Sequence, residues 1–308
     1  MSRTAQATAA ASPPDEDALL FEPGFLRKLE RLELLARKIF RGHLRGEHST
    51  PRRGRGLEFS DFRRYRPGDD FRHIDWNIYS RLDRLFLKLY ASEEDLTLHL
   101  LLDVSASMDF GEPRKFDHAR RLAAALAYIG LVNLDRVGLT AFAGGVGARL
   151  APLKARHHLM SVLEYLRRLE CAGETRLATS LREFTTRVRH PGLVVLISDL
   201  MVREDLAPGV EALKRRGHDV VVLQLLSEWE IEPPLDGALR LVDAEAGDAL
   251  KVTVDEGLRA TYRSRLAAHL ESVERYCRQR GVEYLRASTA IPFQDVVLRY
   301  LRQGALLG

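Results

Sequence analysis

Cysteine is scarce in this sequence of 308 residues. The two cysteines, Cys171 and Cys277, stand far apart and in no paired spacing. So few thiols exclude a disulfide framework and a cysteine-ligated zinc site, and they favour a reducing compartment.

Long apolar runs are also missing. No run in the chain approaches the roughly 20 consecutive apolar residues that cross a bilayer. The N-terminus lacks the apolar core of a signal peptide. We therefore expect a cytoplasmic protein with no transmembrane segment.

A strong net charge is the third absence. The 47 basic and 43 acidic residues leave a formal net charge of +4, which by itself predicts no nucleic-acid role. Walker A, G-x-S-x-G and HExxH sequences are absent too, so ATPase, serine hydrolase and zinc peptidase activities lack their parts. The 45% hydrophobic and 29% charged composition is that of a soluble globular protein with a sizeable core.

The pattern along the chain predicts three parts. Residues 1–23 are rich in Ala, Ser, Thr and Pro and should form a disordered tail. Residues 24–95 should hold an amphipathic helix over 25–40 and a small β-rich module, with a strand over 82–91. Residues 96–308 should form the main domain.

Strand and helix patterns alternate in the main domain. We predict strands over 98–102, 136–143, 147–150, 192–198, 218–225 and 282–287, and helices over 115–134, 157–169, 177–188, 204–216, 258–280 and 291–302. This alternation predicts an α/β fold with a doubly wound, mostly parallel, Rossmann-like sheet. A hairpin near 238–254 interrupts the rhythm as an insertion.

Oxygen-bearing side chains follow the first buried strand. The segment Leu98–Met108 reads LHLLLDVSASM, so Asp103, Ser105 and Ser107 come where the strand ends. In a sheet of order 3-2-1-4-5-6, the first and fourth strands are neighbours, which would place Asp199 beside Asp103. Thr175 would add a third hydroxyl from a polar loop. This set of hydroxyls and carboxylates suits Mg²⁺, with Mn²⁺ or Ca²⁺ as alternatives, and leaves affinity for a further carboxylate.

Each of these residues also has a purely structural interpretation. The Asp103–Ser107 hydroxyls could cap the following turn. Thr175 could be the N-cap of the helix at 177, and Asp199 could cap the helix at 204.

A second candidate surface lies at residues 52–84, where arginines alternate with aromatic residues. Such a stretch could stack and pair with single-stranded nucleic acid. The alternative, which we favour, is that the aromatics form a core and the arginines pair with local acids. The residues concerned are Arg52, Arg53, Arg55, Arg63, Arg64, Arg66 and Arg72, with Phe59, Phe62, Tyr65, Phe71 and Trp76.

These motifs carry two resemblances. Asp-x-Ser-x-Ser after an apolar strand, then Thr175, then a strand-end Asp199, resembles the metal-ion-dependent adhesion site of von Willebrand factor A domains. That resemblance implies that Ser105, Ser107 and Thr175 bind the ion directly, that the aspartates act through water, and that an acidic residue of a partner completes the shell.

The segments GRGLEFSDFRRYRPGDDFRHIDW, YSRLDRLFLKLY, LLLDVSASM and LVDAEAGD resemble the bacterial family called domain of unknown function 58, over about residues 25–303. Many members carry transmembrane helices near the N-terminus, unlike this chain. Members are commonly associated with MoxR-type AAA+ ATPases, which implies such a partner here.

We therefore predict a non-enzymatic, metal-dependent protein-interaction module, an adaptor or co-chaperone that works with an AAA+ ATPase and has no small-molecule substrate. The alternatives are a metal-dependent phosphohydrolase and single-stranded nucleic-acid binding through 52–84. A phosphohydrolase of the haloacid-dehalogenase type needs a second acid two residues after its aspartate, and here that position is Ser105.

Overall fold

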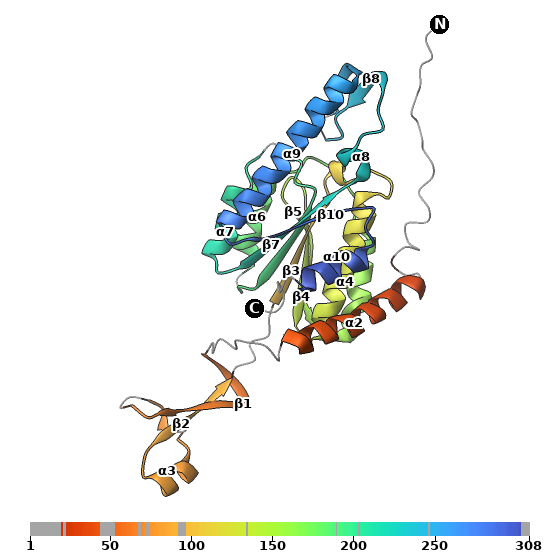
Figure 1. The fold of residues 1–308 in the computed structure, drawn as a ribbon. Coiled ribbons are helices and arrows are strands. Elements are labelled where there is room, and N and C mark those ends of the chain that lie inside the picture. The colour runs from red at the N-terminus through yellow and green to blue at the C-terminus, as the bar shows by residue number, and fades with distance from the viewer. Residues whose placement is uncertain are drawn as a thin grey trace. The chain divides into compact units, whose positions relative to one another are not determined.

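A six-stranded sheet lies at the centre of the larger unit in this computed structural model (Figure 1). Its strands run in the order β10-β7-β6-β3-β4-β5, which in chain order is the predicted 3-2-1-4-5-6 arrangement. All neighbouring pairs are parallel except β4 and β5. Three residues, 143–145, connect β4 to β5, too few for the crossover that a parallel pair requires. The strands are β3 (Thr97–Asp103), β4 (Arg136–Phe142), β5 (Val146–Lys154), β6 (Leu193–Ser198), β7 (Asp219–Leu226) and β10 (Glu283–Ser288).

The structure describes residues 20, 23–43, 53–66, 69–71, 74–91, 97–133, 135–188, 190–202, 204–245 and 247–302. Nearly all of the predicted tail over 1–23 lies outside these residues, as do Arg52 and Arg72. The chain folds as two units, one formed by residues up to 42 and from 97 onward, the other by residues 43–96.

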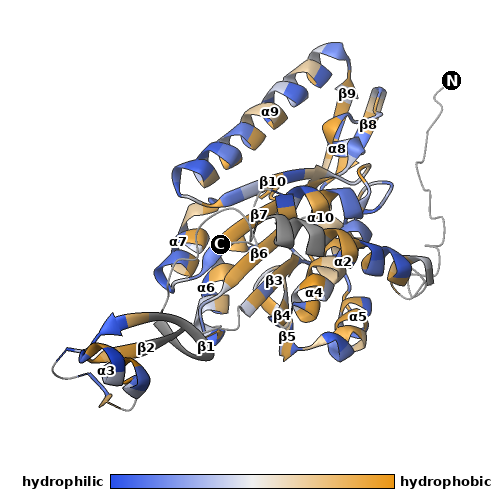
Figure 2. Ribbon diagram, turned by 60° about the horizontal axis from the view of Figure 1, so that its bottom comes forward, coloured by the Kyte–Doolittle hydropathy of each residue, from blue (hydrophilic) through white to orange (hydrophobic). Residues whose placement is uncertain are grey.

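Helices cover both faces of the central sheet. On one face, α2 (Pro23–His43), α4 (Lys115–Val132), α5 (Leu159–Arg167) and α10 (Phe293–Arg302) contribute to one apolar cluster, and on the other α6 (Leu177–Arg187), α7 (Ala207–Arg215) and α9 (Glu256–Gln279) contribute to a second. Figure 2 shows the apolar strands between these two layers. The helices α5 and α7 begin two and three residues later than predicted, because a 3-10 turn and a loop precede them.

The central strand β3 is buried along its whole length. Leu98, Leu100 and Leu102 pack in the first cluster, whereas Leu101 packs in the second. This alternation follows from the two-residue period of a strand, and it explains why the sequence of β3 is continuously apolar. Helix α4 packs closely on the same face, since a Cβ at Gly130 would lie 2.7 Å from Val137 Cγ2.

Helix α2 belongs to the larger unit, which differs from the predicted grouping of residues 24–95. Its Phe25 ring lies 5.3 Å from the Phe293 ring of α10. Its Glu33 Oε2 accepts a 2.6 Å hydrogen bond from the Tyr128 hydroxyl of α4. The amphipathic pattern correctly predicted a helix, but the partner of its apolar face is distant in sequence.

The smaller unit pairs β1 (Arg53–Arg64) antiparallel with β2 (Phe86–Ala91). A short helix, α3 (Trp76–Leu82), precedes β2, so the strand predicted over 82–91 begins at Phe86. The Asp75 side chain caps α3 by accepting hydrogen bonds from the backbone N–H groups of Asn77 and Ile78.

The expected aromatic core of the smaller unit is wrong for Phe71 and Trp76. Phe71 and Trp76 expose 68% and 61% of their surface, and the buried apolar residues described there are Ile74 and Leu87. The expected pairing of arginines with local acids is found at Arg63, which bonds Asp69 at 2.8 Å.

The predicted insertion is a hairpin of β8 (Gly237–Val242) and β9 (Ala249–Val254), which forms a two-stranded sheet of its own. A one-turn helix, α8 (Glu228–Ile231), precedes it and was not predicted. Across the parts of the chain that the structure describes, none of the helices is both long and apolar enough for a membrane span.

Three buried histidines, His99, His118 and His218, have lowered pKa values and make the fold sensitive to acid. Burial lowers the pKa of His99 to about 4. The charges of His218 and Arg149 lower this pKa further, whereas a hydrogen bond with the His190 backbone raises it. Between pH 6.5 and 4 the folded state therefore binds fewer protons than the unfolded state. The contribution of His99 to the unfolding free energy is fully present above pH 6.5 and is lost as the pH falls towards 4.

We predict that His99→Leu loses less unfolding free energy between pH 6.5 and 4 than the wild type. Urea unfolding at several pH values measures this slope. The exposed His157→Leu serves as the control and should keep the wild-type slope. Equal slopes in all three proteins would contradict the assignment.

Candidate metal centre

The first part of the site is the end of β3. Asp103 is the last residue of this strand and is completely buried. Its Oδ1 accepts a 2.9 Å hydrogen bond from the Ser105 backbone N–H, and its Oδ2 accepts a 2.6 Å bond from the Ser198 hydroxyl. Ser198 is the last residue of the neighbouring strand β6. The carboxylate is therefore oriented by its own loop and by the adjacent strand.

Two hydroxyls of the following loop lie together. The Oγ atoms of Ser105 and Ser107 are 3.0 Å apart, and Ser105 is completely buried. Ser105 occupies the N-cap position of the 3-10 turn Ala106–Met108, yet its side chain makes no capping bond. The capping interpretation therefore fails for Ser105.

Thr175 lies at the end of a separate loop, which is bonded through its backbone to the loop that carries the serines. The Ala172 N–H donates to Val104 O at 2.8 Å, and the Ala106 N–H donates to Gly173 O at 2.9 Å. These two bonds align the 171–175 loop with the loop that carries the serines. Thr175 does not cap α6, whose N-cap position is Arg176.

Asp199 follows β6 directly, and β6 pairs with β3, as the strand order requires. Its Oδ1 accepts a 3.0 Å bond from the Met201 N–H. Helix α7 begins only at Ala207, with Leu206 at its N-cap position, so Asp199 does not cap that helix. Backbone bonds join the loop before Thr175 to the loop that carries the serines, and the pairing of β3 with β6 places Asp199 beside Asp103. We call the five predicted residues the oxygen cluster: Asp103, Ser105, Ser107, Thr175 and Asp199.

A buried lysine, which the sequence analysis missed, contacts this cluster. The Lys115 ammonium lies 2.6 Å from Asp199 Oδ2 and 2.5 Å from Glu230 Oε1, and its side chain is fully buried. Burial alone would lower the pKa of Lys115, but the charges of Asp199 and Glu230 outweigh it and raise the pKa above its ordinary value. Lys115 is therefore a resident cation at the edge of the oxygen cluster.

One lysine does not balance the acids around it. Burial, together with the charge of Asp199, raises the pKa of Asp103 to about 7. Burial also raises the pKa of Glu230. The Lys115 ammonium contacts Asp199 and Glu230, and among the described residues Asp103 has only neutral hydrogen-bond partners, with the repelling Asp199 charge beside it. A further cation would therefore stabilise these carboxyl groups. Oxygen donors of this kind fit Mg²⁺ or Mn²⁺ better than a softer metal.

Some sequence signals for the missed residues exist. Lys115 is the first residue of α4, and a cation at a helix N-terminus is unfavourable unless an acid neutralises it. Glu230 completes a capping box with Ser227, a local pattern that orients its carboxylate. Neither signal predicts that Lys115 and Glu230 contact each other, because α4 and α8 are far apart in the chain.

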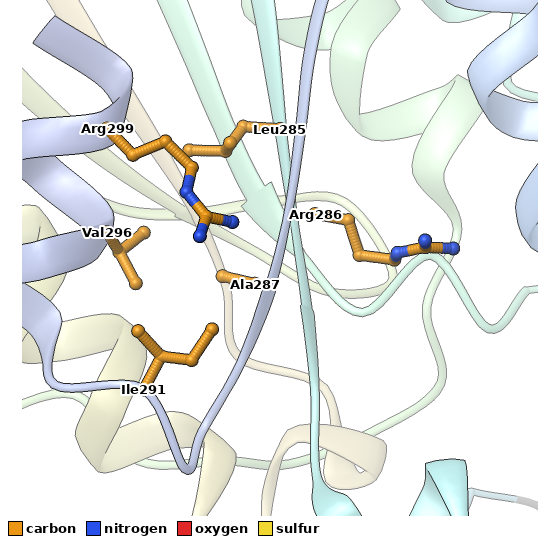
Figure 3. A pocket seen from close by; sticks show the side chains of 6 residues that line it. All are labelled: Leu285, Arg286, Ala287, Ile291, Val296 and Arg299. Carbon is orange, nitrogen blue, oxygen red and sulfur yellow. The ribbon is translucent and has the colours of Figure 1, made fainter. Parts of the chain in front are cut away.

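The surroundings of the cluster carry exposed apolar side chains. Phe110 and Trp229 pack edge to face with their ring centroids 6.1 Å apart. Phe110, Trp229 and Met201 are each 40–42% exposed. A small pocket lies elsewhere, between β10 and α10, and Figure 3 shows Arg299 and Ile291 among its lining residues. None of the lining residues belongs to the oxygen cluster. The described residues contain no group of three or more His, Cys, Asp or Glu side chains arranged to hold a metal; the oxygen cluster has two carboxylates and three hydroxyls.

Comparison with known families agrees with the sequence resemblance. Residues 61–272 match the family described as "Protein of unknown function DUF58". The chain belongs to this family. The uncharacterized protein Rv1480 of Mycobacterium tuberculosis (strain H37Rv) is 29% identical over 297 residues, with 93% of each chain covered. Mb1516 of Mycobacterium bovis, also uncharacterized, matches equally well.

Solved structures show weaker likeness to this DUF58 protein. The conserved hypothetical protein BatB of Bacteroides thetaiotaomicron has a TM-score of 0.44 and 16% identity, covering 68% of this chain and 99% of its own. An aerotolerance-related membrane protein of Bacteroides fragilis has a TM-score of 0.43 and 18% identity, covering 68% and 98% of the two chains.

We predict that Lys115→Met in metal-free buffer lowers the unfolding free energy by about 3–5 kcal/mol, because a buried pair loses one partner. Urea unfolding with EDTA measures the change. Lys251→Met, at an exposed position of β9, is the matched control and should stay within about 0.5 kcal/mol of the wild type. A loss below about 1 kcal/mol for Lys115→Met would show that the ammonium does not neutralise Asp199.

Proposed function

We propose that this DUF58 protein is a non-enzymatic, divalent-metal-dependent module that binds an acidic residue of a protein partner. The observation that supports this most is the buried Asp103 carboxyl, whose pKa is raised by burial and by Asp199, at the start of the loop that carries the paired Ser105 and Ser107 hydroxyls. A hard cation at this place would relieve the repulsion between the two carboxylates.

Ser105, Ser107 and Thr175 would hold the ion directly, and Asp103 and Asp199 would act through water, as the adhesion-site resemblance implies. The ion would supply a positive charge that binds a carboxylate from outside. This chain's own residues orient the donors: Ser198 and the Ser105 N–H fix Asp103, and the Met201 N–H and Lys115 fix Asp199. In this proposal the larger unit is a von Willebrand factor A-like domain.

The apolar surroundings favour a protein partner over a small molecule. Phe110, Met201 and Trp229 are exposed near the segments that carry the cluster, and exposed apolar groups around a polar centre are typical of protein interfaces. The family resemblance implies a MoxR-type AAA+ ATPase as this partner, with assembly or remodelling of proteins as the task and the cytoplasm as the location.

Two other functions have less support. A phosphohydrolase would need an acid at position 105, where the serine hydroxyl instead contacts Ser107. Nucleic-acid binding by the smaller unit has exposed Phe71 and Trp76 for stacking, but Arg63 is engaged by Asp69.

We predict that Mg²⁺ or Mn²⁺ stabilises the wild type by about 2.7 kcal/mol when the ion is present at about 100 times its Kd. Thermal unfolding with and without the ion measures the shift. The shift should vanish in the double variant Asp103→Ala, Ser105→Ala. The double variant Asp248→Ala, Ser272→Ala, which changes the same residue types at exposed positions, is the control and should keep the shift.

An identical shift in the Asp103→Ala, Ser105→Ala protein would place the metal elsewhere. The same preparations are tested with p-nitrophenyl phosphate. Turnover by the wild type that Asp103→Asn abolishes would contradict the non-enzymatic assignment.

We also predict that the wild type, immobilised in Mg²⁺, recovers an AAA+ ATPase of MoxR type from extract of its own cells. Recovery should be lost with EDTA and with Asp103→Ala, because both remove the bound ion. Mass spectrometry identifies the recovered protein, and Asp248→Ala is the control. Equal recovery by Asp103→Ala in EDTA would show that the partner does not bind through the metal.

A further inference from the structure

A carboxylate from the β8–β9 hairpin already lies on the oxygen cluster. Glu245 Oε1 accepts a 2.8 Å hydrogen bond from the Thr175 hydroxyl, and Glu245 Oε2 accepts a 3.1 Å bond from the Thr175 backbone N–H. Both carboxylate oxygens thus bind one buried threonine of the proposed metal centre. Glu245 lies 70 residues from Thr175 in the chain.

The hairpin is built to present this side chain. The turn between β8 and β9 is closed by bonds from Gly247 N–H to Asp243 O and from Glu245 N–H to Asp243 Oδ1. Gly247 has a φ of 74°, which favours glycine at this position. Asp243, Gly247 and Asp248 are exposed, whereas Glu245 is partly buried. The acid at the tip is therefore the side chain that points inward.

The charge of Glu245 has no cationic partner within the described part of the chain. Its carboxylate bonds to two neutral donors of Thr175. Both of these hydrogen bonds therefore end on a residue of the oxygen cluster. A carboxylate held there is less favourable without a cation than with a divalent ion that it can bind.

We propose that Glu245 is an internal ligand of the metal centre: its carboxylate takes the position of the partner's acidic residue, so that the hairpin covers the site until a partner displaces it. This inference rests on the proposed function. The tethered hairpin competes with any free acid at an effective concentration of roughly millimolar or above. A partner must therefore make further contacts with this chain, and the exposed Phe110 and Trp229 offer an apolar surface for them.

The test uses Mn²⁺ and acetate with the full chain. Mn²⁺ affinity is measured by electron paramagnetic resonance on the wild type, Glu245→Ala and the control Asp248→Ala. We expect Glu245→Ala to weaken Mn²⁺ binding by about 10-fold or more, as loss of a group that supports a metal does. Added acetate should restore the affinity of Glu245→Ala, because it fills the vacated carboxylate position, and should leave the wild type and Asp248→Ala unchanged.

Hydrogen exchange gives a second readout that needs no partner. Mg²⁺ should slow exchange of the amides of residues 243–248 in the wild type and not in Glu245→Gln. If Mn²⁺ binds all three proteins equally and Mg²⁺ does not change hydrogen exchange in the hairpin, Glu245 is not an internal ligand. The proposed metal centre is not contradicted by that result. If the wild type binds no Mn²⁺, or Asp103→Ala, Ser105→Ala binds it as well as the wild type, the proposed function itself fails.

Discussion

The structure around the site depends on the repulsion between two buried carboxyl groups at the ends of neighbouring strands. Asp103 is the last residue of β3, and Asp199 directly follows the neighbouring strand β6. Burial, together with the charge of Asp199, raises the pKa of Asp103. Ordinary folding would avoid this pair, since burying a charge costs several kcal/mol per ion. The fold accepts it by placing the Lys115 ammonium on Asp199. Such an arrangement is retained where a buried charge has a use, and here the use we propose is a metal ion.

Several elements converge to make this arrangement possible. Helix α4 begins with Lys115 soon after β3 ends, so this cation lies at the carboxyl edge of the sheet before the helix runs back to the other edge. The loop before α6 carries Thr175, and α8 and the hairpin carry Glu230 and Glu245. All of these segments follow the ends of strands or flank the same edge, which is where open α/β sheets place their ligands. The topology therefore assembles the site from residues spread over more than a hundred positions.

Much of this could be predicted from the sequence. The continuous apolar run of β3, the alternation of strands and helices and the strand-end position of Asp199 were enough for the sheet order and for the neighbouring positions of Asp103 and Asp199. The grouping of α2 with the small module failed, because an amphipathic pattern shows that a face is buried and does not show against what. The aromatic core of the small unit failed for the same reason: Phe71 and Trp76 are apolar, yet the described part of that unit offers little to bury them against.

The sequence by itself determined the α/β fold class and the polar residues at the strand ends, because local hydrophobic periodicity and strand-end residues are short-range features. Only the tertiary structure decided which charged and polar side chains contact one another. Lys115 finds Asp199 across 84 residues, and Glu245 finds Thr175 across 70. Such contacts depend on the crossover connections and on the position of the hairpin, which no local sequence pattern predicts. An isolated lysine or glutamate in a sequence is usually a solvated surface residue. The balance of charge at the oxygen cluster is therefore a property of the folded chain.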